Sequence, residues 1–179
     1  TKHNIITGNR VFIFNSCFTI CFCSIHITHT QIFIYCIIID IKSFKINEIK
    51  MFHTMWQKAL NTPLTSSVGR LFDAISSFAN ILHMQTYEGE TGLQIEQNYD
   101  SSIKHIYSYK ILKNEIDLSS MIKEIIKDKD KKTICSKFIN TIVKIILEIS
   151  EKYKDLPLVL SGGVFQNKTL LEILIDKFE

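Results

Sequence analysis

Apolar residues recur at helical spacing soon after residue 60. In the stretch NTPLTSSVGRLFDAISSFANILHM they return every three or four positions, which predicts a single apolar stripe along an amphipathic helix. The stripe comprises Val68, Leu71, Phe72, Ile75, Ala79 and Leu82. Thr65, Ser66 and Ser67 precede it and are candidate N-caps, because their side-chain oxygens can accept from free backbone N–H groups. The pattern therefore predicts a helix that begins after one of these three residues and carries the stripe through Leu82.

The pattern changes twice more before residue 130. YEGETGLQIEQNYD predicts a turn at Gly89 and a second helix that ends near Tyr99. HIYSYKILKNEIDL alternates like a strand or a hairpin, with Asn114 near its turn, and Asp117 is expected to cap the helix that follows.

A long helix and a final strand–turn–helix unit complete the pattern. Residues 131–153 predict one long amphipathic helix, and LPLVL predicts a short buried strand. Residues 161–163 are then the turn, and residues 167–178 the last helix. Because helices flank strands throughout, the expected fold class is α/β.

Composition divides the chain near residue 50. Residues 11–39 contain no Asp, Glu, Lys or Arg, and 1–50 form an atypical Ile-, Phe- and Cys-rich segment, whereas 51–179 have the composition of a globular domain. Three interpretations remain open for the first segment. It is a stretch that does not belong to a natural fold, which we favour, or a membrane anchor, or a metal site. The metal site would use Cys17, Cys21, Cys23, His26 and His29, but it lacks a second, separated ligand pair.

Chain length, net charge and cysteine count exclude some classes of function. The 179 residues suffice for one ordinary domain, and a net charge of +3 without a basic cluster predicts no binding to nucleic acid. Five cysteines are an odd count without disulfide spacing, so we expect a protein of the reducing cytoplasm. Cys135 has no basic or His neighbour in sequence, which argues against a nucleophilic role.

The stretch LVLSGGVFQN contains the first candidate for chemistry. Two adjacent glycines between a strand and a helix let a ligand touch the backbone, and the helix N-terminus offers free N–H groups to an anion or a nucleotide. The alternative is a tight strand-to-helix turn that needs a positive φ. The spacing leaves both open, because it matches neither a Walker A loop nor a G-x-G-x-x-G fingerprint.

Asp73 is the second candidate. A carboxylate one turn into a helix can accept hydrogen bonds from sugar hydroxyls. The alternative is a favourable charge near the helix N-terminus, or an i,i+3 partner for Arg70. Spacing alone favours the alternative.

Three blocks carry a resemblance to a known family. NTPLTSSVGRLFDAISSF, TYEGETGLQIE and LPLVLSGGVFQNKTLLEIL resemble, in that order, the C-terminal part of the HypF carbamoyltransferases of nickel–iron hydrogenase maturation. A more distant similarity is to TsaD, the tRNA threonylcarbamoyl-adenosine enzyme. The resemblance begins near Met51 and implies part of an actin-like ATPase (ASKHA) type domain, with helices packed on a short sheet. Where the family usually has Phe-His, this chain has Phe138 and Ile139, so any role of that His is absent.

The resemblance implies a carbamoyl transfer. HypF-like proteins make carbamoyl adenylate from carbamoyl phosphate and ATP in another domain. The domain resembled here passes the carbamoyl group to the C-terminal Cys thiol of the partner HypE. The positions that match the family's nucleotide contacts are Gly69, Asp73, Ser161, Gly162, Gly163 and Asn167. Of these, Asp73 with Gly69 before it matches a position that holds the ribose.

Some family features are expected to be absent. The family holds a metal ion with a His-rich motif upstream and an Asp downstream of the Ser-Gly-Gly block. His26 and His29 lack the family's spacing, and the chain reaches Glu179 before such an Asp. We therefore expect the metal only in a full-length protein, and little or no transferase activity from this chain as a fragment.

Two further hypotheses compete with the transferase fragment. One is a non-catalytic nucleotide-binding or partner-docking remnant that still meets HypE. The other is a small membrane-anchored protein that uses residues 11–39.

Overall fold

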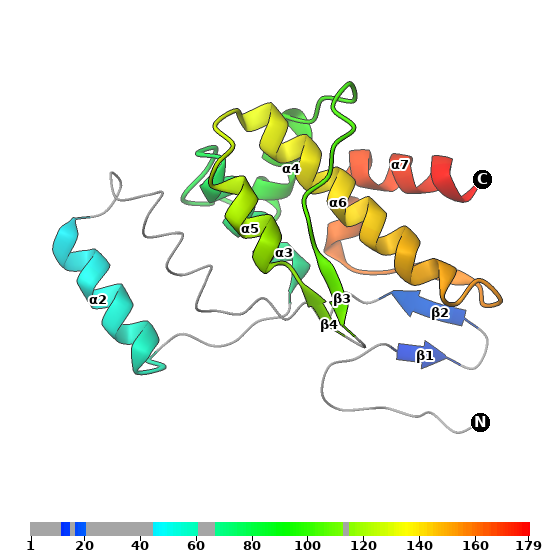
Figure 1. Ribbon diagram of the computed structural model, residues 1–179, viewed down its shortest axis with the longest axis horizontal. Coiled ribbons are helices and arrows are strands. Elements are labelled where there is room, and N and C mark those ends of the chain that lie inside the picture. Colours follow the sequence, from blue (N-terminus) through cyan, green and yellow to red (C-terminus); the bar gives the residue numbers. More distant parts are fainter. Residues whose placement is uncertain (1–11, 15–16, 21–44, 61–66, 113–114) are drawn as a thin grey trace.

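The computed structural model describes residues 12–14, 17–20, 45–60, 67–112 and 115–179 (Figure 1). In chain order its elements are β1 (Phe12–Phe14), β2 (Cys17–Ile20), α2 (Ile46–Gln57), α3 (Val68–Phe78), α4 (Glu90–Gln97), β3 (Lys110–Leu112), β4 (Glu115–Asp117), α5 (Ser119–Ile125), α6 (Lys131–Glu151), β5 (Leu158–Leu160), the 3-10 helix η1 (Gly163–Gln166) and α7 (Lys168–Phe178). The expected α/β class, with helices packed on short strands, is confirmed.

The long helix α6 is the centre of the hydrophobic core. Its apolar stripe is buried against α3, α5 and α7, which surround it in Figure 1. Phe72 of α3 meets Phe138 of α6 edge-to-face, with 4.8 Å between the ring centroids. Ile139 is completely buried in the same core. This helix thus supplies packing on most of its circumference.

Two small sheets accompany the helices. β2 pairs antiparallel with β1 and parallel with β5, with Thr19 opposite Val159. β3 and β4 form an antiparallel hairpin with Ile111 opposite Ile116, so of the two expected alternatives, a strand or a hairpin, the structure has the hairpin. Asn114, expected near its turn, lies outside the described residues.

The first segment is described only in part. β2 lies beside β5, and the expected boundary at residues 50 and 51 falls inside α2, which lies apart from the other helices in Figure 1. Cys21, Cys23, His26 and His29 lie outside the described residues. Within the part of the chain that the structure describes, no helix is both long and apolar enough to cross a membrane.

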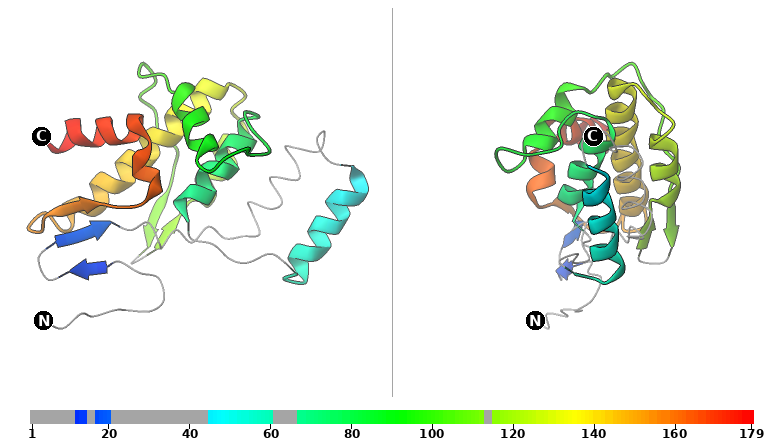
Figure 2. Two further views of the ribbon diagram at one scale, coloured as in Figure 1. Left: turned by 180° about the vertical axis from the view of Figure 1, so that it is seen from behind. Right: turned by 90° about the vertical axis from the view of Figure 1, so that its left-hand side faces the viewer.

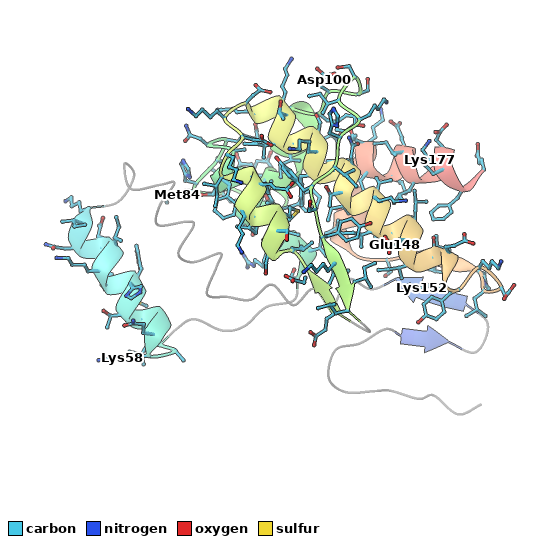
Figure 3. All side chains as sticks on the ribbon, viewed as in Figure 1. Lys58, Met84, Asp100, Glu148, Lys152 and Lys177 are labelled. Atoms are coloured by element: carbon cyan, nitrogen blue, oxygen red, sulfur yellow. The ribbon has the colours of Figure 1, made fainter. Side chains whose placement is uncertain are left out.

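Polar side chains of α6 hold the extended segment that leads to β3. The backbone N–H of Asp100 donates to Ser136 Oγ at 2.8 Å, and that of Tyr107 donates to Thr141 Oγ1 at 2.8 Å. Asn140 Nδ2 donates to the carbonyl oxygen of Ile103 at 2.7 Å. Because a buried backbone needs hydrogen-bond partners, these side chains replace a neighbouring strand. Further along, the Tyr109 hydroxyl donates to Glu148 at 2.7 Å; Figure 3 labels Glu148 on α6.

Some predicted bounds were wrong. Helix α3 begins after its N-cap Ser67, one of the three candidates, but ends at Phe78 rather than reaching Leu82. Asn80 adopts a φ of 51°, in the left-handed region that ends a helix, so the apolar spacing beyond Phe78 was not helical. The strand predicted as LPLVL is shorter, and Val159 is 40% exposed rather than buried.

Helix α5 begins one residue later than expected, so Asp117 lies one position before its N-cap. The N-cap of α5 is Leu118, and Asp117 Oδ1 accepts from the backbone N–H of Ser119 at 2.9 Å. This hydrogen bonding to Ser119 lowers the pKa of the Asp117 carboxyl. Asp117 is therefore not the N-cap that the sequence predicted, and it stabilises the start of α5 by a turn-type contact instead.

Candidate functional site

One open cavity of about 950 Å³ contains most of the candidate residues. Its walls come from the start of α3, the loop before α4, the first half of α4, and η1 with the residue after it. These elements lie together on the face seen in the left view of Figure 2. The described lining residues are Ser67, Gly69, Arg70, Phe72, Asp73, Gln85, Tyr87, Glu88, Gly89, Thr91, Gly92, Leu93, Glu96, Gly163, Val164, Gln166 and Asn167. The walls therefore join residues up to 100 positions apart in sequence.

Asp73 is held by three other side chains at this cavity. Its Oδ1 accepts from the Thr91 hydroxyl at 2.7 Å and from the Gln85 amide. Its Oδ2 accepts from the Arg70 guanidinium at 3.1 Å, and this i,i+3 ion pair is the alternative that spacing favoured. The Asp73 side chain remains 28% exposed. The carboxylate is thus both tied to its neighbours and open to the cavity.

The glycine pair forms a turn that requires glycine at its first position only. Gly162 has a φ of 108° and a ψ of 161°, a region that other residues almost never occupy. Gly163 opens η1 and has no such φ. A Cβ at either position would meet nothing within 4 Å. The turn interpretation therefore holds for Gly162, whereas Gly163 lines the cavity and its contact with a ligand stays a prediction.

Asn167 is occupied by structural contacts. Its Oδ1 accepts from the backbone N–H of Leu170 at 2.9 Å, so it is the N-cap of α7. Its Nδ2 donates to the carbonyl oxygen of Gly92 at 3.1 Å, which joins α7 to α4. Glu96 strengthens the same junction by accepting from the backbone N–H of Lys168 at 2.9 Å. The expected nucleotide contact at Asn167 would have to share an amide that already has two partners.

The structure brings together four of the six predicted nucleotide contacts. Gly69, Asp73, Gly163 and Asn167 line the cavity, whereas Ser161 and Gly162 are exposed outside its lining. The sequence interpretation missed Thr91 and Gln85, which hold Asp73. No spacing signal marks these two residues. Thr91 lies inside the block TYEGETGLQIE that carried the family resemblance, and Gln85 directly precedes that block.

The charge of the cavity suits hydroxyl groups better than phosphates. Its described lining contains one guanidinium, that of Arg70, and three carboxylates, those of Asp73, Glu88 and Glu96. The first turns of α3 and α4 both contribute lining residues, and their free N–H groups offset part of the negative charge. Carboxylates accept hydrogen bonds from sugar hydroxyls, but they repel a bare phosphate.

The described residues offer neither a reactive thiol nor a metal centre here. Cys135 is fully buried in the core, and burial raises the pKa of its thiol to about 12, which agrees with the predicted lack of a nucleophilic role. No group of three or more His, Cys, Asp or Glu side chains within the described ranges could hold a metal ion. The carboxylates of the cavity therefore do not fit a metal site by themselves.

Comparisons with known proteins identify the class of this domain. Residues 25–179 match the family described as carbamoyltransferase, Kae1-like domain, second subdomain. The match begins inside the segment that composition set apart, and β1 and β2 precede it. Fold and cavity thus belong to a Kae1-like carbamoyltransferase domain.

Individual relatives make the assignment specific. Carbamoyltransferase HypF of Synechocystis sp. is 33% identical over 129 residues, which are 68% of this chain and 17% of that protein. Probable carbamoyltransferase HypF of Methanocaldococcus jannaschii is 27% identical over 143 residues, 74% of this chain and 18% of that protein. This chain belongs to the HypF carbamoyltransferase family, as its three sequence blocks predicted.

A solved structure supports the same assignment. The crystal structure of full-length HypF in the phosphate- and nucleotide-bound form matches with a TM-score of 0.69 and 28% identity, over 82% of this chain and 26% of that chain. The chain thus spans less than a fifth of the length of the two curated relatives and about a quarter of the solved protein.

Proposed function

We propose that the cavity binds the nucleoside part of an adenine nucleotide, ATP or carbamoyl adenylate, as one wall of a carbamoyl-transfer site. The observation that carries the proposal is that Asp73 and Gly163, 90 residues apart, line the same cavity. An open carboxylate can accept from ribose hydroxyls, while bare backbone at Gly163 admits a flat base or a sugar at close range. The similarity to full-length HypF in its phosphate- and nucleotide-bound form supports this proposal.

The reaction that we propose is transfer of the carbamoyl group from carbamoyl adenylate to the C-terminal Cys thiol of a HypE-like partner. This chain would hold the adenylate leaving group during the transfer. Other parts of a larger protein would supply the carbamoyl adenylate and the family's metal ion. The carboxylate of Asp73 and the bare backbone at Gly163 suit binding and orientation, so we assign these roles to the cavity.

That same lining favours a second candidate, a nucleotide-binding or partner-docking module without catalysis of its own. A thiol-carbamoylation assay with purified HypE bears on both candidates. Carbamoylation of HypE by this chain with added carbamoyl adenylate excludes the module, whereas nucleotide binding without transfer agrees with the module and with a transferase fragment that needs the rest of a larger protein.

Calorimetry tests the nucleotide proposal directly. We expect ATP and a carbamoyl-adenylate analogue to bind the 179-residue chain, and Asp73→Asn to weaken both about tenfold or more, because hydrogen bonds to a charged acceptor are the stronger ones. Asp155→Asn is the matched control, an exposed carboxylate outside the cavity lining. If the wild-type chain binds neither compound, or Asp73→Asn binds them as tightly as wild type, the proposal is wrong.

A further inference from the structure

The two oxygens of Asp73 have different partners. Oδ1 accepts from two neutral donors outside α3, the Thr91 hydroxyl at 2.7 Å and the Gln85 amide. Oδ2 accepts from Arg70, whose side chain is 72% exposed. A carboxylate oxygen has about two acceptor directions. Among the described residues, Oδ1 is therefore filled, while Oδ2 keeps one direction for a ligand.

The hydroxyl of Thr91 differs from the other two donors in its burial. Thr91 is only 4% exposed, whereas Gln85 and Arg70 are exposed. A buried donor on a neighbouring helix has few other orientations, so it restricts the rotamer of the carboxylate that it holds. It also adds no charge, so the carboxylate keeps its strength as an acceptor.

We infer that Thr91, assisted by Gln85, is a positioning residue that holds Asp73 so that Oδ2 faces a sugar hydroxyl in the cavity. The inference rests on the proposed function, because Asp73 must contact the sugar. Thr91 itself does not contact the ligand in this scheme. Its effect on binding comes from the orientation of Asp73, because a loosely held carboxylate loses part of each hydrogen bond to ordering.

Variants of Thr91 separate positioning from general structure. Thr91→Val keeps the shape and removes the donor, and Thr91→Ser keeps the donor. Gln85→Met removes the second donor at an exposed position. Thr86→Val is the matched control, because the Thr86 hydroxyl donates to Glu90 at 3.0 Å and Thr86 lies outside the cavity lining.

Calorimetry with ATP and with 2′,3′-dideoxy-ATP, which lacks both ribose hydroxyls, supplies the readout. We expect Thr91→Val to lower the affinity for ATP about tenfold and to leave the affinity for dideoxy-ATP unchanged, since only the contact with the ribose hydroxyls depends on Asp73. Gln85→Met should act in the same direction more weakly. Thr91→Ser and Thr86→Val should bind both nucleotides like wild type. Equal weakening of both nucleotides in Thr91→Val, or none, would overturn the inference.

A measurement without nucleotide keeps the inference distinct from the proposed function. Three-bond couplings report χ1 of Asp73 in solution, and we expect one rotamer in wild type and averaged rotamers in Thr91→Val. Suppose that wild type binds neither nucleotide, or binds both equally, while the χ1 rotamers of Asp73 are averaged in Thr91→Val. The proposed ribose contact is then wrong, and the positioning role of Thr91 is supported. If χ1 is the same in both proteins, the positioning role is wrong.

Discussion

Asn167 on the chain segment before α7 donates from Nδ2 to the carbonyl oxygen of Gly92 on α4, 75 residues earlier, at 3.1 Å. Its other side-chain atom, Oδ1, accepts from the backbone N–H of Leu170 and closes the first turn of α7. Asn167 is 8% exposed, so water competes little for either contact. One amide therefore caps a helix and joins two walls of the cavity.

Substitutions at Asn167 should separate these two contacts. Asn167→Asp keeps the acceptor that caps α7 and loses the donor to Gly92, whereas Asn167→Ala loses both. We expect a loss in the free energy of unfolding of about 2 kcal/mol for Ala and about 1 kcal/mol for Asp. Urea unfolding measures both. Equal losses for the two variants would show that the cap contributes nothing, and no loss in either would contradict both contacts.

The glycine pair should respond unequally to alanine. Gly162→Ala forces a side chain into a φ of 108° and should lower the free energy of unfolding by about 1–3 kcal/mol. Gly163→Ala has ordinary backbone and open space around its Cβ, so its stability should stay within about 0.5 kcal/mol of wild type.

The same pair also bears on binding. If the backbone of Gly163 touches the nucleotide, Gly163→Ala should lower the affinity for ATP while the urea midpoint is unchanged. The matching calorimetry on Gly163→Ala is informative because the variant is folded. Wild-type affinity in Gly163→Ala would place the nucleotide away from η1.

Asp128 ties the loop before α6 to the core. Its Oδ2 accepts from the Tyr107 hydroxyl and from Lys137 Nζ, each at 2.8 Å, and the Lys137 ammonium lies 4.1 Å from the centroid of the Tyr107 ring. Tyr107 is fully buried, so Asp128→Ala leaves its hydroxyl without this acceptor. We expect a loss of about 2–3 kcal/mol in the free energy of unfolding.

A double-mutant cycle checks the origin of that loss. Tyr107→Phe should cost about 1–2 kcal/mol, and the double variant should lose less than the sum, because the two residues share a contact. Glu172→Ala is the control: it breaks a surface pair with Lys168 at 3.7 Å, with side chains 65% and 74% exposed, and should change little. Additive losses would contradict a direct Tyr107–Asp128 contribution.

Stability should fall in alkali because of Cys135. Burial, and then the nearby Asp130 charge, raise the pKa of its thiol from 9.0 to about 12. The unfolded chain therefore releases this proton first, so the contribution is fully present below pH 9 and is lost as pH rises toward 12. The slope from this one group is at most about 1.4 kcal/mol per pH unit.

Comparison of wild type with Cys135→Ala between pH 9 and 10 isolates the thiol. Burial also raises the pKa of the Tyr107 and Tyr109 hydroxyls above their ordinary 10.0, which adds alkaline destabilisation of the same sign at higher pH. Urea unfolding should show a shallower decline in Cys135→Ala, while measurements at pH 7 account for the lost side-chain volume. Parallel declines in the two proteins would contradict a buried, neutral Cys135.

Sequence patterns predicted the elements better than their ends. Local spacing and turn chemistry predicted most of the stripe of α3, a group of three N-cap candidates that includes Ser67, and the turn at Gly89; for residues 110–117 they left a strand or a hairpin open. The extension of α3 to Leu82 failed because apolar spacing continues past the point where Asn80 turns the backbone into the left-handed region. Periodicity marks which residues face a core, and it does not report where backbone hydrogen bonding stops.

Local chemistry was enough to establish that this chain contains amphipathic helices, a glycine turn before the last helix, and a carboxylate one turn into α3. Each of these depends on residues within a few positions of one another. Long-range packing was needed to join them. The Oδ1 atom of Asp73 is hydrogen-bonded to Thr91, 18 residues later, and Asn167 is hydrogen-bonded to Gly92, 75 residues earlier. No spacing pattern in the sequence predicts either pair. Those contacts arise because α3, α4 and α7 are packed around α6 and η1, and they shape the cavity.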